Sequence, residues 1–190
     1  MTSCEFDDIE KSACGVGFIT SRKGISNHEH LEQALHALRC VEYRGACGVD
    51  QISSDGAGLM TDIPFELLGL EKGSMAVSTL FLPSDTELRR QILRMLGETF
   101  EFLGLQIEGY REVPVNPDVL GEEARQSMPV ILQAFIARPD YCRTDASFNR
   151  LLFQAKQTMR NRTRSRGIMG EYFFSSISSS FCASASISVF

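Results

Sequence analysis

The sequence lacks the cysteine spacing that marks a metal or iron–sulfur site. None of its six cysteines forms a C-x-x-C pair, so a zinc ribbon or a ferredoxin-like cluster is not expected. The six are Cys4, Cys14, Cys40, Cys47, Cys142 and Cys182. The His-x-His of His28 and His30 is a weak metal signal, because residues two apart on a helix do not point together. We therefore predict no metal centre in this chain.

A secretion signal and a membrane-spanning segment are also missing. The opening stretch "MTSCEFDDIEKSA" is acidic and contains no apolar core. No run in the sequence approaches the ~20 apolar residues that a membrane helix needs. These absences predict a cytoplasmic protein with reduced thiols and no membrane partner.

An excess of positive charge is missing as well. The formal net charge is -5, so no general attraction to nucleic acid is expected. One local exception is "KQTMRNRTRSR", which contains Lys156, Arg160, Arg162, Arg164 and Arg166 and no acid. No aromatic residues interleave with these charges, which favours a solvated helix end, where cations suit the helix dipole, over an RNA-binding patch.

The length and composition of the chain are those of an ordinary globular domain. The chain has 190 residues, 43% of them hydrophobic and 23% charged, and it is long enough to bury a core without disulfides or metals. Apolar and β-branched runs predict strands, and 3.6-residue periodicity predicts helices. Ser26 with Glu29, and Ser84 with Glu87, have capping-box spacing at two helix starts. Strands are predicted over 14–20, 59–63, 75–82, 105–115, 129–137 and 171–178, and helices from about 26, from 84, over 117–126 and over 146–159.

The last stretch of the sequence differs in composition. No charged residue follows Tyr172, and serine is abundant. The alternation in "ASASISVF" allows a strand. It equally allows an end left by truncation, and the pattern does not decide between the two.

The tetrapeptide "ACGV" occurs twice, at 13–16 and at 46–49. A cysteine in a short apolar strand is usually a packed core residue, and a reactive thiol needs a base or a positive charge beside it. Cleavage before Cys14 would place a free α-amino group beside its thiol, and that amine can act as the base near neutral pH. Cys47 cannot take this role, because exposing it as a terminus would discard the first strand and helix.

Three segments carry a resemblance to a known family. "ACGVGFIT", "EQALHALRCVEYRGACG" and "SDGAGLMTDIP" resemble the start of the glutaminase domain of the glutamate synthase large chain, a type-2 glutamine amidotransferase domain of the N-terminal-nucleophile (Ntn) hydrolase class. The resemblance is dense over roughly residues 11–68 and continues in element order to about 179. It implies an α+β fold of the four-layer αββα sandwich type, of which this chain would contain an incomplete version. It also implies glutamine as substrate and no nucleic-acid partner.

The resemblance also assigns roles to individual residues. It implies that a leader of residues 1–13 is removed at Ala13–Cys14, and that Cys14 then serves as nucleophile and α-amino base. It implies an electrostatic role near that thiol for Arg44, and a supporting turn. That turn consists of Gly45, Asp55, Gly56 and Gly58. Cys47 matches a family cysteine without a catalytic role.

Several features depart from the family pattern. Tyr43 stands where histidine is usual, and Ser54 replaces a glycine before Asp55. The Asn-Gly pair that supplies the family's oxyanion hole is missing. The hypothesis is therefore a partial amidotransferase domain over 14–180, followed by an atypical Ser-rich tail over 181–190.

Three functions remain open at the level of sequence. The first is a glutaminase domain of a glutamate synthase, whose full-length family implies FMN, an iron–sulfur cluster and further synthase domains or subunits, none of them within this chain. The second is a truncated, inactive fragment or interaction module. The third and weakest is a redox protein using Cys14 and Cys47.

Overall fold

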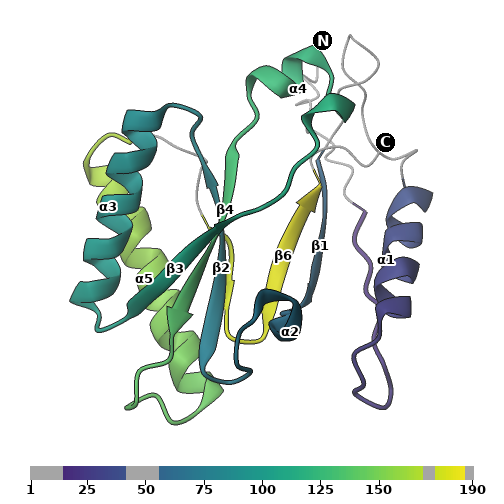
Figure 1. The fold of residues 1–190 in the computed structure, drawn as a ribbon, viewed down its shortest axis with the longest axis horizontal. Coiled ribbons are helices and arrows are strands. Elements are labelled where there is room, and N and C mark those ends of the chain that lie inside the picture. Colours follow the sequence, from purple (N-terminus) through teal and green to yellow (C-terminus); the bar gives the residue numbers. More distant parts are fainter. Residues whose placement is uncertain (1–14, 42–55, 169–173, 187–190) are drawn as a thin grey trace, which may run out of the picture.

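The computed structural model describes residues 15–41, 56–168 and 174–186 (Figure 1). The helices are α1 (His28–Cys40), α2 (Phe65–Leu68), α3 (Thr86–Phe102), α4 (Glu122–Gln126) and α5 (Asp145–Ser165), with a 3-10 turn over Pro117–Val119. The strands are β1 (Ala57–Asp62), β2 (Met75–Leu82), β3 (Gln106–Glu112), β4 (Val130–Ala137), β5 (Phe174–Ser178) and β6 (Phe181–Ser186). Helices and strands therefore mix along the chain, as the periodicity predicted.

The larger sheet is antiparallel and has the strand order β3–β4–β2–β5. Its central strand β2 pairs with β4 in unbroken register from Met75↔Ala137 to Leu82↔Val130. β2 is buried over most of its length, because both faces of the sheet are covered. Residues on one face of β2, such as Ala76 and Leu80, join the main core, while Val77 faces a second, smaller one.

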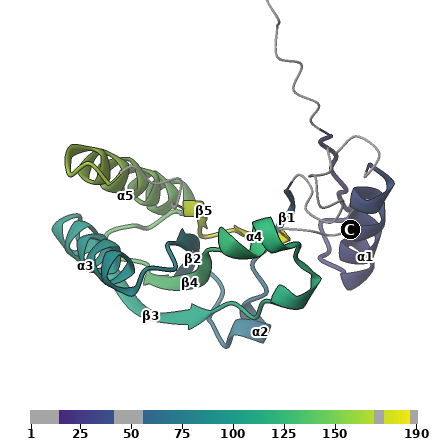
Figure 2. The same ribbon diagram turned by 90° about the horizontal axis from the view of Figure 1, so that it is seen from above.

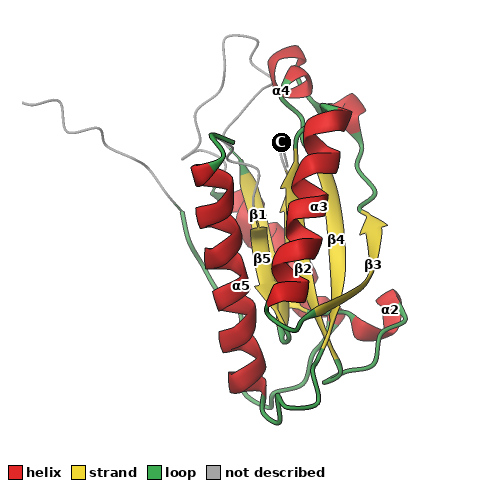
Figure 3. Ribbon diagram, turned by 90° about the vertical axis from the view of Figure 1, so that its left-hand side faces the viewer, coloured by secondary structure: helices red, strands yellow, loops and turns green. Residues whose placement is uncertain are grey.

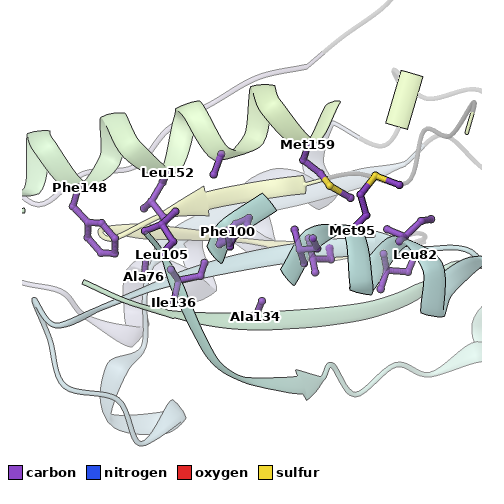
Figure 4. Packing of buried hydrophobic residues seen from close by; sticks show 14 of the residues in the cluster. Ala76, Leu82, Met95, Phe100, Leu105, Ala134, Ile136, Phe148, Leu152 and Met159 are labelled. Atoms are coloured by element: carbon purple, nitrogen blue, oxygen red, sulfur yellow. The ribbon is translucent and has the colours of Figure 1, made fainter. Parts of the chain in front are cut away.

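Helices α3 and α5 form a layer on one face of this sheet (Figure 3). Their apolar stripes meet the sheet in the main core, which Figure 4 shows from close by. Phe148, Leu152, Ala155 and Met159 face inward from α5. Burial of a Phe, Leu or Met side chain contributes roughly 1.5–3 kcal/mol, so this layer supplies much of the stability of the fold.

The smaller sheet pairs β1 with β6 and lies on the other face, where its Cys182 contacts Val77 of β2 in the second core. Helix α1 covers the far side of this pair, so the layers read α, β, β, α (Figure 2). This is the four-layer order that the family resemblance implied. α1 has no buried residue, and among the described strands it lies on the two-stranded sheet of β1 and β6.

The strand predicted over 14–20 is not formed. Within the described residues, 15–20 have no regular secondary structure. Val16 and Phe18 are 95% and 91% exposed. A strand is stabilised by hydrogen bonds to a neighbour, and no described strand pairs with this segment, so its apolar composition alone does not order it.

Both predicted helix caps are wrong by one residue. α1 is capped by Asn27, whose side chain accepts from the Glu29 amide, and α3 is capped by Asp85, which accepts from the Leu88 amide. Asn and Asp are as good N-caps as serine, and the backbone conformation selects which neighbour serves. The helix predicted over 117–126 is divided into the 3-10 turn and α4, with Gly121 as the N-cap of α4.

The Ser-rich end of the chain forms β6 over Phe181–Ser186, so the strand alternative holds there. Within the described ranges, no helix is long and apolar enough to cross a membrane. The same ranges contain no group of three or more His, Cys, Asp or Glu side chains arranged to hold a metal ion.

Candidate active site

Most of the predicted site lies outside the described residues. This applies to Cys14, Arg44, Gly45 and Asp55, and to the leader 1–13. Gly56 and Gly58 are described, as are the residues that flank each missing segment. These flanking residues lie next to the candidate site in the chain.

The residue after Cys14 lies against the end of α1. A methyl group placed on Gly15 would be 3.5 Å from Cβ of Val41, an ordinary van der Waals distance. Val41 is the C-cap of α1 and stands three positions before Arg44. The chain next to the predicted nucleophile thus lies close to the chain next to the predicted arginine.

Helix α1 runs antiparallel to β1, which brings a third segment to the same end. The hydroxyl of Ser26, just before α1, donates to Oδ2 of Asp62 at the end of β1, over 2.6 Å. The other ends of the two elements, the C-terminal end of α1 and the start of β1, therefore both lie toward the top in Figure 1. Gly15, Val41 and Gly56 mark one end of the α1–β1 layer as the location of the candidate site.

The two described glycines of the predicted supporting turn differ in structure. Gly56 is exposed, and a Cβ added there would meet nothing within 4 Å. Gly58 lies inside β1 and pairs with Ala185, so its assignment to a turn is wrong. The backbone is extended there because β6 supplies the pairing partner.

Two buried hydroxyl groups fix β6 onto the larger sheet. Oγ1 of Thr79 donates to the carbonyl oxygen of Ala183 over 3.2 Å. The amide of Ala183 donates to Oγ of Ser176 over 2.9 Å. Thr79 and Ser176 are almost fully buried, so water does not compete for these bonds. We name this pair of bonds the Ala183 clamp.

A second polar group ties the β5–β6 turn to α5. Oδ1 of Asn149 accepts from the amide of Ser179 over 3.0 Å and from the hydroxyl of Ser178 over 3.3 Å. Nδ2 of Asn149 donates to Oγ of Ser179 over 3.0 Å. The position of β6, and through its pairing that of β1, is thus fixed by hydrogen bonds from three elements, β2, β5 and α5.

Neither the Ala183 clamp nor the hydrogen bonds of Asn149 were predicted from the sequence. Their signals were present: Ser78 and Thr79 interrupt the apolar strand "MAVSTLFL", and serines surround Ile177 in "SSISSS". A polar residue in a buried strand requires a hydrogen-bond partner. The sequence therefore shows that these hydroxyl groups need hydrogen-bond partners. It does not show which residues the partners are, because they are distant along the chain.

Burial controls the chemistry of one nearby thiol. Desolvation raises the pKa of Cys182 on β6, the charge of Asp62 raises it further, and a hydrogen bond with Thr61 acts in the opposite direction. A protonated, buried thiol is a poor nucleophile. Cys182 is therefore a packing residue of the second core.

Comparison with known proteins decides the family. Residues 14–183 match the family described as "Glutamine amidotransferases class-II". The chain belongs to this family. The match begins at Cys14 and ends at Ala183, the residue held by the Ala183 clamp.

Similar proteins of this amidotransferase family are glutamate synthases. The chain is 36% identical over 179 residues to "Ferredoxin-dependent glutamate synthase 2, chloroplastic" of Arabidopsis thaliana, covering 89% of this chain and 11% of that one. It is 40% identical over 152 residues to "Ferredoxin-dependent glutamate synthase 2" of a Synechocystis strain, covering 75% and 10%. It is 29% identical over 180 residues to "Glutamate synthase [NADPH] large chain" of Bacillus subtilis, covering 90% and 12%. The chain thus spans about a tenth of the length of these relatives.

Proposed function

We propose that this amidotransferase chain hydrolyses glutamine to glutamate and ammonia through Cys14 as an N-terminal nucleophile. The observation that carries the proposal is the family match, which begins at this cysteine. It agrees with removal of the acidic leader 1–13. Because the amine of a terminal cysteine is attached to the same residue as its thiol, no separate histidine base is needed.

In the proposed reaction, the thiol of Cys14 gives its proton to its own α-amino group. The thiolate attacks the side-chain amide carbon of glutamine, and the carbonyl oxygen becomes an oxyanion. When this intermediate collapses, the carbon–nitrogen bond breaks, and the leaving nitrogen takes a proton and departs as ammonia. Water then attacks the γ-glutamyl thioester, releases glutamate and restores the thiol.

We further propose that Arg44 acts near this thiol, since a guanidinium charge favours the thiolate. The proximity of Gly15 to Val41 supports this role, because Gly15 directly follows Cys14 and Val41 stands three positions before Arg44. Gly45, Asp55, Gly56 and Gly58 form the proposed supporting segment. The open space at Gly56 is compatible with close approach of a substrate.

The names of the relatives suggest the wider context. In a glutamate synthase the ammonia would pass to other domains, where 2-oxoglutarate would accept it to form a second glutamate. We propose those domains as the partners of this chain. The isolated chain tests only the glutaminase half-reaction.

The decisive experiment compares two cysteines that share the same tetrapeptide. Intact-mass measurement should give a chain that starts at Cys14, and purified protein should release ammonia from glutamine. Cys14→Ala should abolish release, while the matched variant Cys47→Ala should retain it. Release that persists in Cys14→Ala refutes the nucleophile, and a wild-type chain that starts at Met1 or Thr2 refutes processing. A processed chain that releases no ammonia would favour the inactive alternative for the isolated domain.

A further inference from the structure

The outer surface of α1 carries a thiol and an imidazole that the proposed reaction does not use. Nε2 of His36 and Sγ of Cys40 lie 3.8 Å apart, and both side chains are exposed. The residues stand four apart on the helix, so they are neighbours on one face. α1 forms the outermost layer of the fold, which leaves this face open to solvent (Figure 2).

The spacing of these two atoms suits a shared metal ion. Zinc binds imidazole nitrogen at about 2.0–2.1 Å and thiolate sulfur at about 2.3 Å, and a tetrahedral angle then separates the two donor atoms by about 3.6 Å. The observed 3.8 Å is close to that value, so little side-chain movement is required. As a hydrogen bond, by contrast, the contact is weak, because a thiol is a poor donor and water competes at an exposed site.

We propose that His36 and Cys40 form a two-residue binding site for a borderline transition-metal ion such as Zn²⁺ or Co²⁺. One imidazole and one thiolate favour such ions over Mg²⁺ or Ca²⁺, which prefer oxygen ligands. On binding, the thiol of Cys40 loses its proton to solvent and sulfur takes the metal bond, while His36 ligates through Nε2. Water completes the coordination shell.

The same helix provides a control pair of similar geometry. Nε2 of His28 lies 3.3 Å from Oε1 of Glu32, also four residues apart and also exposed. This pair has an imidazole and a carboxylate but no sulfur. Of these two pairs, His36–Cys40 is the one that contains a thiol and can produce a thiolate-to-metal charge-transfer absorption.

The test is a titration with Co²⁺ of the reduced, chelator-treated full chain carrying Cys14→Ala, which removes a second possible thiolate ligand, followed by near-ultraviolet absorption. One equivalent should produce a thiolate-to-cobalt band, and Zn²⁺ should displace it. Cys40→Ser should abolish the band and His36→Gln should weaken binding by tenfold or more, while His28→Gln should leave the titration unchanged. All three positions are exposed, and circular dichroism checks that each variant is folded.

Three results would overturn the proposal. They are a Cys14→Ala chain without the band, a band that survives Cys40→Ser, and binding that is unaffected by His36→Gln. Because the readout is metal absorption, none of these outcomes depends on whether the chain hydrolyses glutamine.

Discussion

The hydroxyl of Thr79 donates a hydrogen bond to the carbonyl oxygen of Ala183, joining the central strand of the larger sheet to β6 of the smaller sheet. With Ser176 on the amide of the same residue, it holds the strand that pairs with β1 and thereby sets the start of β1 at Ala57. The contribution of the Ala183 clamp to the free energy of unfolding is measurable.

We expect Thr79→Val to destabilise the fold by about 1–3 kcal/mol, because the variant keeps the volume but leaves the partly buried Ala183 carbonyl without its donor. Urea denaturation would measure the loss. Ser165→Ala, which removes an exposed hydroxyl at the end of α5, is the control and should change the free energy of unfolding by less than about 0.5 kcal/mol. Equal effects in the two variants would mean that the clamp contributes nothing specific.

Two phenylalanines on α5 provide a matched test of the main core. Phe148 is 0% exposed and Phe153 is 59% exposed. We expect Phe148→Ala to cost about 3–5 kcal/mol, since it removes a buried ring and leaves a cavity. Phe153→Ala should stay within about 0.5 kcal/mol of wild type. Chemical denaturation of both variants checks this, and a larger loss at Phe153 would contradict the arrangement of α5 on the sheet.

The N-cap of α3 is Asp85 in the structure, whereas the capping-box spacing predicts Ser84. Asp85→Ala should cost about 1 kcal/mol, because the Leu88 amide loses the carboxylate that accepts its hydrogen bond over 2.6 Å. Ser84→Ala should have little effect, although its spacing to Glu87 predicted it as the cap. Thermal unfolding of the two variants decides between the residues, and the opposite ranking would restore the capping-box assignment.

The described cysteines should differ in reactivity. Cys40 is exposed, whereas Cys142 and Cys182 are buried. A brief reaction with iodoacetamide in native buffer, followed by peptide mass spectrometry, should label Cys40 and spare the other two until the chain is denatured. Rapid native labelling of Cys182 would contradict its packing in the second core.

The pH dependence of stability follows from the same thiol. Burial raises the pKa of Cys182 in the folded chain, so the unfolded thiol ionises first, near its ordinary pKa of about 8.5. Its contribution is complete below that pH and is lost as the pH rises through the folded value. Stability measured from neutral to alkaline pH should fall less steeply in Cys182→Ala than in wild type. An identical slope would contradict the raised pKa.

Local patterns predicted the main elements well, because their causes are local. The apolar run before Pro83 predicts a strand over 75–82, which is where β2 lies. The 3.6-residue periodicity over 146–159 predicts a helix, and α5 contains that range. The strand at 14–20 failed because pairing depends on a partner elsewhere in the chain. The same limit applies to the candidate site. The motifs around Cys14 and Arg44 identified the family, whereas the proximity of Gly15 to Val41 and the Ala183 clamp arise only when distant segments meet.

The pairing of β1 with β6 also has a consequence for the order of folding. β1 is the first described strand and β6 the last, so their ladder closes the longest loop among the described strand pairs. Closing such a loop costs chain entropy before any contact stabilises it. During synthesis, β1 must therefore wait for nearly the whole described chain to emerge, while the consecutive strands β3 and β4 and helix α3 can already pack together. The layer that carries the candidate site is thus expected to be the last part of the domain to assemble.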